Sequence, residues 1–141
     1  MGLLEESGLL MKQGEEILTR TFANGKIPRG SWTGEVESYH QYYKRSVREH
    51  MTHSIFNNGE LVLTNSRLIA VAKLGVFKKN TIPFMVLDFD KIQSVKTEKP
   101  LIGKEALVVA INAMPPGKAF FEVDNASKWV DDIKNKLSNM Q

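Results

Sequence analysis

The chain has 141 residues and no cysteine, a length that fits one domain able to bury a core without disulfides or metal ions. Its 19 basic and 16 acidic residues are mostly interspersed, which argues against the concentrated basic stripe of a nucleic-acid-binding protein. The chain shows no basic region followed by an apolar run, and no stretch approaches the roughly 20 apolar residues of a membrane span, so we expect a cytoplasmic protein.

The chain begins with a predicted arm and a first strand. Residues 1–13 mix leucines with acidic residues, which is typical of a short amphipathic turn or docking arm that precedes a single domain over residues 14–141. Alternating apolar positions predict a strand over residues 16–23. Asn24 and Gly25 are turn residues, so we expect the strand to stop there.

Residues 24–58 form a predicted insertion. Apolar and aromatic residues recur at spacings of three and four, which predicts a helix over residues 34–49. The alternative interpretation takes the same tyrosine and valine content as strand. Residues 54–56 are also placed to pair with residues 61–63 as a hairpin around the turn residues 57–59.

The clearest structural signal is a tight β-hairpin in the middle of the chain. Two β-rich runs, residues 61–64 and 68–72, flank the polar cluster 65–67, which has the composition of a hairpin turn. We expect a basic loop to follow over residues 74–80.

Two strands are predicted after this loop. The first covers residues 81–89, and its Pro83 belongs at the strand's start or on a sheet edge because proline lacks an amide donor. The second covers residues 91–98 with Ile92 and Val95 facing inward. These two positions skip the strand's alternation, which indicates a bulge.

The chain closes with two more strands and a helix. The strands are predicted over residues 106–113 and 118–123, and either Asp124 or Asn125 caps the helix that follows. An apolar stripe along this helix consists of Trp129, Val130, Ile133, Leu137 and Met140. Six or seven short strands followed by one helix predict a mainly β fold, a sandwich or partly open barrel with a C-terminal capping helix and an inserted helix.

Several of these segments together resemble the bacterial pleckstrin-homology-like (PH-like) and GRAM-like domains. The motifs are GELVLTNSRLIA from Gly59, TIPF from Thr81, DKIQSV from Asp90, and the terminal helix with Trp129. The resemblance covers residues 14–140. It implies seven strands in two nearly orthogonal sheets, with the C-terminal helix plugging one open end and its tryptophan facing the core.

The resemblance also implies a possible anion-binding site. In eukaryotic relatives three loops gather at one end of the domain and hold a phosphoinositide headgroup. The corresponding residues here are Lys26, Arg29, Lys73, Lys78, Lys79 and Lys118. The chain departs from the lipid-binding pattern, because the [Lys/Arg]-x-Arg triplet of the strongest binders is missing between Lys26 and Arg67.

The sequence contains no constellation that favours catalysis or a cofactor. The lack of cysteine excludes a thiolate zinc site and a cysteine nucleophile, and no nucleophile elbow, phosphate loop or dinucleotide fingerprint occurs. Asp88 and Asp90 lie two apart on a predicted strand and so share a face, where a solvated surface is the favoured interpretation. The one metal-like cluster, with spacings that do not match a zinc protease, consists of His40, Glu49, His50 and His53.

Aromatic residues of the insertion favour a partner surface. Tyr42 does not fit the apolar stripe of the predicted helix, which indicates aromatic surface on a second side. The residues concerned are Trp32, Tyr39, Tyr42 and Tyr43. We therefore expect a non-enzymatic module that binds protein partners, copies of itself included, through residues 24–58 or an exposed strand edge. The alternative is a peripheral membrane adapter that binds anionic headgroups through its basic loops, each lysine contributing about 1 kcal/mol.

Overall fold

The computed structural model describes residues 2–28, 53–74, 80–99, 103–112 and 117–139. Within these ranges the chain forms one seven-stranded sheet in the order β4-β3-β2-β1-β7-β6-β5, with antiparallel neighbours throughout. The strands are β1 (Ile17–Pro28), β2 (His53–Thr64), β3 (Arg67–Leu74), β4 (Asn80–Asp88), β5 (Ile92–Glu98), β6 (Ala106–Ile111) and β7 (Gly117–Glu122). The sheet is not closed into a barrel, and the helix α3 (Ala126–Ser138) follows it. The predicted mainly β fold with a C-terminal helix is confirmed.

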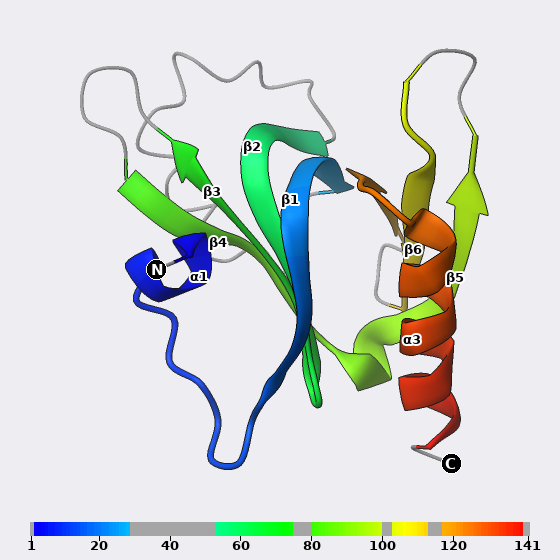
Figure 1. The fold of residues 1–141 in the computed structure, drawn as a ribbon, viewed down its shortest axis with the longest axis horizontal. Helices are drawn as coiled ribbons and strands as arrows, with labels where there is room; N and C mark the ends of the chain where they lie inside the picture. The colour runs from blue at the N-terminus through cyan, green and yellow to red at the C-terminus, as the bar shows by residue number, and fades with distance from the viewer. Residues whose placement is uncertain (1, 29–52, 75–79, 100–102, 113–116, 140–141) are drawn as a thin grey trace.

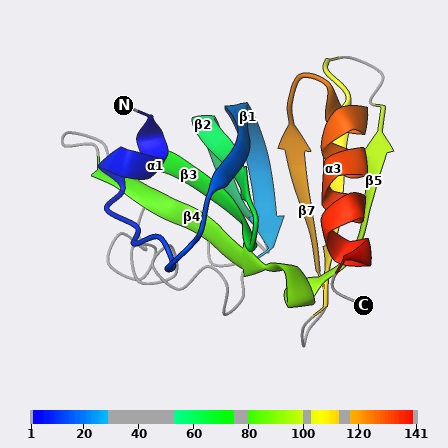
Figure 2. The ribbon, with the colours of Figure 1, turned by 60° about the horizontal axis from the view of Figure 1, so that its bottom comes forward.

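Strand β1 joins two parts of the sheet. It pairs with β2 along its length but with β7 only at residues 24–26. Strands β2, β3 and β4 lie on one side of β1, and β5, β6 and β7 lie on the other (Figures 1 and 2). Helix α3 packs against β5 and β6, so its apolar stripe and the inner sides of both parts enclose one core.

The core confirms the predicted stripe of α3. Trp129, Val130 and Ile133 are buried in the same cluster as the inner side chains of the strands, and Leu137 packs partly buried against it. Asn125 occupies the N-cap position, but its side chain makes no capping hydrogen bond. Its φ is +57°, a left-handed conformation that asparagine tolerates better than most residues. The predicted capping interaction is therefore absent at this position.

Two predicted turns near the insertion are wrong. Strand β1 continues through Asn24 to Pro28, and β2 runs as one strand through Asn57 and Asn58, so no hairpin forms there. Ala23 pairs with Gly59 and Gly25 pairs with Phe56, which leaves Asn24 opposite both Asn57 and Asn58. This arrangement is a β-bulge, in which one strand carries an extra residue. The φ of Asn58 is +56°, so the turn-forming asparagines bend the strand without ending it.

The ring of Phe56 fills space left by two glycines. A side chain at Gly25 would collide with this ring, and a Cβ at Gly59 would lie 2.6 Å both from the ring and from the Val71 carbonyl oxygen. The Phe56 ring centroid lies 4.8 Å from that of Phe84, a distance typical of favourable aromatic pairs. The two glycines therefore allow β1 and β2 to close over a large core side chain.

Other local predictions are confirmed. The central hairpin forms with Leu63 opposite Leu68, and Pro83 lies on β4, which is an edge strand. Ile92 and Val95 are both buried, and the register shifts after Ile92, as expected for a bulge.

The close fit around Phe56 can be tested by adding one methyl group. Gly25→Ala should lower the free energy of unfolding by about 1–3 kcal/mol, because overpacking a filled core forces side chains to move. Urea denaturation followed by circular dichroism measures this change. Ser127→Ala, on the exposed side of α3, is the control and should stay within about 0.5 kcal/mol of wild type.

A second variant identifies the colliding group. Phe56→Leu by itself should lower the free energy of unfolding. In the Gly25→Ala background the same substitution should lower it less, because the leucine leaves room for the new methyl group. Strictly additive losses would show that the Phe56 ring is not what excludes a side chain at Gly25.

Candidate partner-binding face

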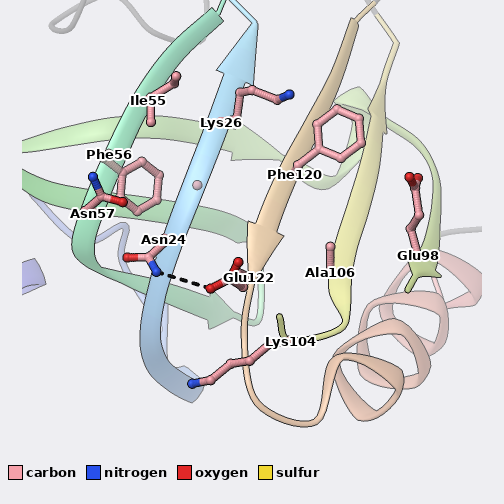
Figure 3. A pocket seen from close by; sticks show the side chains of 11 residues that line it. Asn24, Lys26, Ile55, Phe56, Asn57, Glu98, Lys104, Ala106, Phe120 and Glu122 are labelled. Atoms are coloured by element: carbon pink, nitrogen blue, oxygen red, sulfur yellow. Dashed lines mark hydrogen bonds between the residues drawn. The ribbon is translucent and has the colours of Figure 1, made fainter. Parts of the chain in front are cut away.

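A pocket of about 500 Å³ lies on the side of the sheet that faces away from α3, which we call the outer face. It lies where β1 meets β7, because β1 and β7 pair only over residues 24–26. Polar and apolar residues of strands β1, β2, β5, β6 and β7 surround it (Figure 3). The lining residues are Asn24, Gly25, Lys26, Ile55, Phe56, Asn57, Glu98, Lys104, Ala106, Phe120 and Glu122.

The pocket has apolar walls and a polar rim. Phe56 is almost completely buried, whereas Ile55 is 55% exposed. The Lys26 Nζ lies 5.1 Å from the centroid of the Phe120 ring, within the range of a cation–π interaction. The Asn24 side chain donates from Nδ2 to Glu122 Oε1 at 3.4 Å, so two of the rim residues hold each other in place.

Asn24 also ties the pocket to the β-bulge. The backbone N–H of Asn58 donates to Asn24 Oδ1 at 2.9 Å. The Asn24 side chain thus bridges β2 and β7 across β1, because its amide nitrogen is the donor to Glu122. This bridge fixes the strands that form two sides of the pocket.

An exposed aromatic residue lies beside the pocket. Phe22 is 82% exposed although it lies within β1, and it is two residues before Asn24, so both side chains share the outer face. A large apolar side chain standing in solvent on a regular strand gains nothing from the fold of its own chain. It is therefore available to a partner.

Charged residues of the outer face form two rows across the strands. Pairing places Lys96 opposite Val108, Val108 opposite Phe120, Phe120 opposite Lys26 and Lys26 opposite Ile55. We call these five residues the basic row. The next row along the strands, the acidic row, consists of Glu98, Ala106, Glu122 and Asn24. The two rows are two residues apart on each strand, or about 7 Å.

The N-terminal arm covers the other part of the outer face. Residues 3–6 form the short helix α1 (Leu3–Glu6), whose Leu4 is buried on the outer side of β2 and β3. There it contacts a cluster formed by Val62, Ile69 and Val71. The arm therefore shields the apolar outer surface of β2 and β3, and the pocket lies on the part that it leaves open.

Arg20 holds α1 in place through two carboxylates. Its guanidinium donates to Glu5 at 2.7 Å and to Glu60 at 2.7 Å, and the backbone N–H of Leu4 donates to Glu60 as well, at 3.2 Å. Hydrogen bonds from Arg20 lower the pKa of Glu5 to about 2. Glu5 therefore stays ionised over the whole neutral range.

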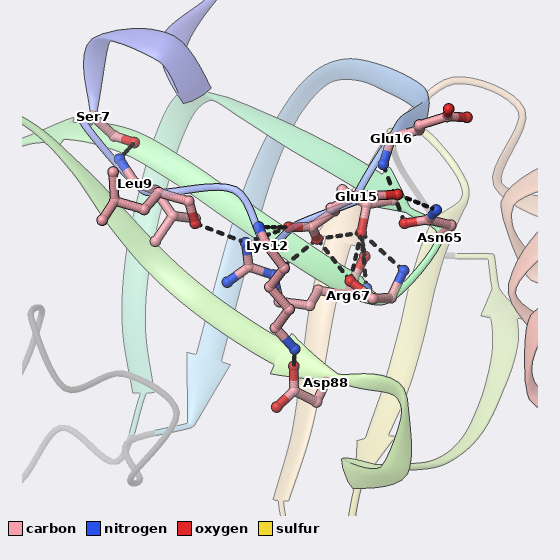
Figure 4. Close-up of polar contacts among 12 residues, drawn as sticks. Ser7, Leu9, Lys12, Glu15, Glu16, Asn65, Arg67 and Asp88 are labelled. Carbon is pink, nitrogen blue, oxygen red and sulfur yellow. Dashed lines mark hydrogen bonds and ion pairs between the residues drawn. The ribbon is translucent and has the colours of Figure 1, made fainter.

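A buried ion pair at Glu15, just past the predicted arm of residues 1–13, anchors the arm's other end (Figure 4). The Glu15 side chain is 1% exposed and that of Arg67 is 7% exposed. Arg67 donates to both carboxylate oxygens of Glu15, at 2.7 Å from Nη2 and 2.9 Å from Nε. Thr64 and Ser66 donate their hydroxyls to the same carboxylate at 2.6 and 2.8 Å. Arg67 also donates to the Leu10 carbonyl at 3.1 Å, so the hairpin turn binds the arm at two points.

These hydrogen bonds decide the charge state of Glu15. Burial alone would raise its pKa, but the hydrogen bonds from Arg67, Thr64, the Lys12 backbone and Ser66 together outweigh it and lower the pKa well below the ordinary value. The T-x-x-R part of the hairpin motif thus has a structural role here. It supplies the hydroxyl and the guanidinium that bind the arm.

The structure separates the lysines of the predicted anion site. Lys26 and Lys118 are exposed on neighbouring strands β1 and β7. Lys73 lies on β3, where its Nζ is 3.7 Å from Glu6 of the arm. Arg29, Lys78 and Lys79 lie outside the described residues.

Several other predicted site residues also lie outside the described residues. The predicted helix 34–49 lies outside the described residues, and so do Trp32, Tyr39, Tyr42, Tyr43, His40, Glu49 and His50. Of the predicted pair of aspartates, Asp88 ends β4 and Asp90 lies in a 3₁₀ turn, Phe89–Lys91, so the prediction that they share a strand face is wrong. Asp88 forms an ion pair with Lys12 at 2.9 Å.

Sequence reasoning missed most of the outer face. Phe22, Ile55 and Phe120 are apolar residues on strands, and such residues are assigned to the core unless the strand's facing is known. The alternation of Ala23, Gly25 and Ile27 is the one signal that points Phe22 outward. This alternation can be recognised only when the strand is known to continue past Asn24.

Comparisons with protein families and with curated proteins identify no relative of this chain. No protein-family model matches the chain, and no curated protein matches it either. Among the helices that the structure describes, none has the length and apolar character needed to cross a membrane. Within the described ranges, no three His, Asp or Glu side chains are grouped so that they could hold a metal ion.

The buried pair can be tested by removing its carboxylate. Glu15→Ala should lower the free energy of unfolding by about 3–5 kcal/mol, because it leaves the Arg67 guanidinium without a charge partner. Glu16→Ala is the matched control, since the Glu16 residue is exposed. A loss no larger than that of Glu16→Ala, measured by urea denaturation, would contradict an anchoring role for the pair.

The same pair should make stability depend on pH. The folded-state pKa of Glu15 is lower than the ordinary value of 4.5, so the unfolded chain binds the proton more readily. The contribution is complete above the unfolded pKa and declines as the pH falls below it. Urea denaturation in buffers at about pH 5 and about pH 2.5 measures this effect. Between these two pH values, wild type should lose more unfolding free energy than Glu15→Gln, which has no carboxylate at this position to protonate.

Proposed function

We propose that this protein is a non-enzymatic PH-like interaction module that binds protein partners, copies of itself included, through its outer face. The observation that carries the proposal is Phe22, 82% exposed on β1 beside a pocket of about 500 Å³ with apolar walls. Exposed apolar surface rimmed by polar residues is the usual mark of a protein interface.

The energetics favour a protein partner. Burying one exposed aromatic side chain stabilises a complex by roughly 1.5–3 kcal/mol, and aromatic residues are common among the residues that dominate binding. The rim carries both signs of charge, with Lys26 and Lys104 beside Glu98 and Glu122. Such a rim suits a protein surface, which also carries both signs.

The PH-like assignment is supported by the fold. Seven antiparallel strands, a C-terminal helix and a buried Trp129 are features that the sequence resemblance also implies, although the strands form one sheet where the resemblance implies two. Both described ends of the predicted insertion, residues 24–28 and 53–58, are strand. They supply Lys26, Ile55 and Phe56 to the pocket, which supports the expectation that this segment contributes to a partner surface.

A peripheral membrane adapter is the alternative function. It is favoured by the exposed lysines Lys26, Lys96 and Lys118, which are all on the outer face. Glu98 and Glu122 lie on the same face, and an anionic membrane would repel them.

The proposal is tested by removing the exposed ring. Wild type should associate as its concentration rises, and Phe22→Ser should weaken this association at least about tenfold, because each 1.4 kcal/mol lost is a factor of ten. Sedimentation velocity over a concentration series measures the association. Leu10→Ser is the matched control, since Leu10 is 85% exposed on the arm, away from this pocket.

Two results would contradict the proposal. Equal association of wild type and Phe22→Ser would remove the outer face as the binding surface. A wild type that stays monomeric, yet pellets with phosphatidylserine vesicles at low salt, would favour the membrane adapter.

A further inference from the structure

We infer that the partner on the outer face is a second copy of this chain, packed face to face about a two-fold axis, with the basic row of each copy against the acidic row of the other. This inference rests on the proposed function and specifies the partner and its orientation. It follows from how the charges are ordered on the outer face.

The two rows carry opposite charges, which lie on the same strand at Lys96 and Glu98 and on neighbouring strands at Lys26 and Glu122. Lys96 and Lys26 lie in the basic row, and Glu98 and Glu122 lie in the acidic row. Lys96 and Glu98 occupy the same face of β5, two residues apart, and both are exposed. Among the described residues, none of these four side chains forms an ion pair.

A two-fold axis can bring these opposite charges together in two symmetric sets of contacts. The axis lies in the plane of the outer face, midway between the two rows and parallel to them. Rotation about this axis places the basic row of one copy opposite the acidic row of the second copy, and the acidic row opposite the basic row. Every contact then occurs twice, as in all two-fold interfaces. Lys96 comes opposite Glu98 of the second copy, and Lys26 comes beside Glu122 of the second copy.

The apolar residues occupy the middle of the same surface. Phe120 lies between the two lysines of the basic row and is partly exposed, and Ile55, which is 55% exposed, ends the row. Val108 also lies between the lysines, but it is only 2% exposed and adds no surface for a partner. Phe22 stands next to the acidic row on β1. Apolar side chains in the centre supply most of the affinity of an interface, whereas exposed charge pairs add little to it.

The charges instead select the orientation. Turning one copy so that like rows meet would bring lysine against lysine and glutamate against glutamate, which disfavours that arrangement. A uniformly basic partner or a membrane would satisfy only one of the two rows. A second copy satisfies both.

The experiment reverses one row at a time. The basic-row variant is Lys26→Glu with Lys96→Glu, and the acidic-row variant is Glu98→Lys with Glu122→Lys. Each variant alone places like charges opposite each other and should associate at least about tenfold more weakly than wild type. An equimolar mixture should form a heterodimer of wild-type affinity, because every pair is again opposite in sign.

Native mass spectrometry with one variant isotopically labelled distinguishes the heterodimer from either homodimer. Lys134→Glu, an exposed charge reversal on α3, is the control and should leave association unchanged. Circular dichroism verifies that the variants fold. Lys96→Glu and Glu98→Lys as single changes repeat the test at exposed positions of β5 that make no hydrogen bond to other described side chains.

The outcomes separate this inference from the proposed function. If the variants associate as wild type does, or if the mixture forms no heterodimer, the face-to-face arrangement is wrong. Association that still depends on Phe22 would leave the proposed function in place. A wild type that stays monomeric overturns both.

Discussion

The packing of Phe56 between Gly25 and Gly59 is the constraint on which both sides of the sheet depend. On the inner side the ring contacts Phe84 in the core, and the same ring and Gly25 line the pocket on the outer face. A side chain at either glycine would push the ring away. The residues that complete the core therefore also shape the surface proposed to bind a partner.

Two glutamate–arginine contacts divide the outer face into a covered and an open part. Arg20 holds α1 through Glu5, and Arg67 holds the end of the arm through Glu15. The second contact is almost fully shielded from water, and its charge-assisted hydrogen bonds are stronger than those between neutral groups. Because the arm covers β2 and β3 and ends short of β7, the exposed ring of Phe22 lies on the open part.

The open part combines apolar area with charges of both signs. Lysines lie at one level of the strands and glutamates at the next. A membrane surface attracts cations and repels anions, whereas a folded protein can present both. This difference favours a protein partner, and the regular order of the rows makes a second copy the simplest one. The mainly β fold is compatible with this use because function lies in sites carried by a fold and not in the fold itself.

Local patterns in the sequence determined the elements: the central hairpin, the edge position of Pro83, the bulge after Ile92 and the core stripe of α3. Each depends on alternation or on the chemistry of one residue, which neighbouring positions reveal. Tertiary structure alone decided that Asn24 bridges strands where a turn was expected, and that Glu15 meets a residue 52 positions away. It also decided the candidate site, because strand register brings Lys26 beside Phe120. Register depends on pairing between distant segments, and no local pattern in the chain records which segments pair.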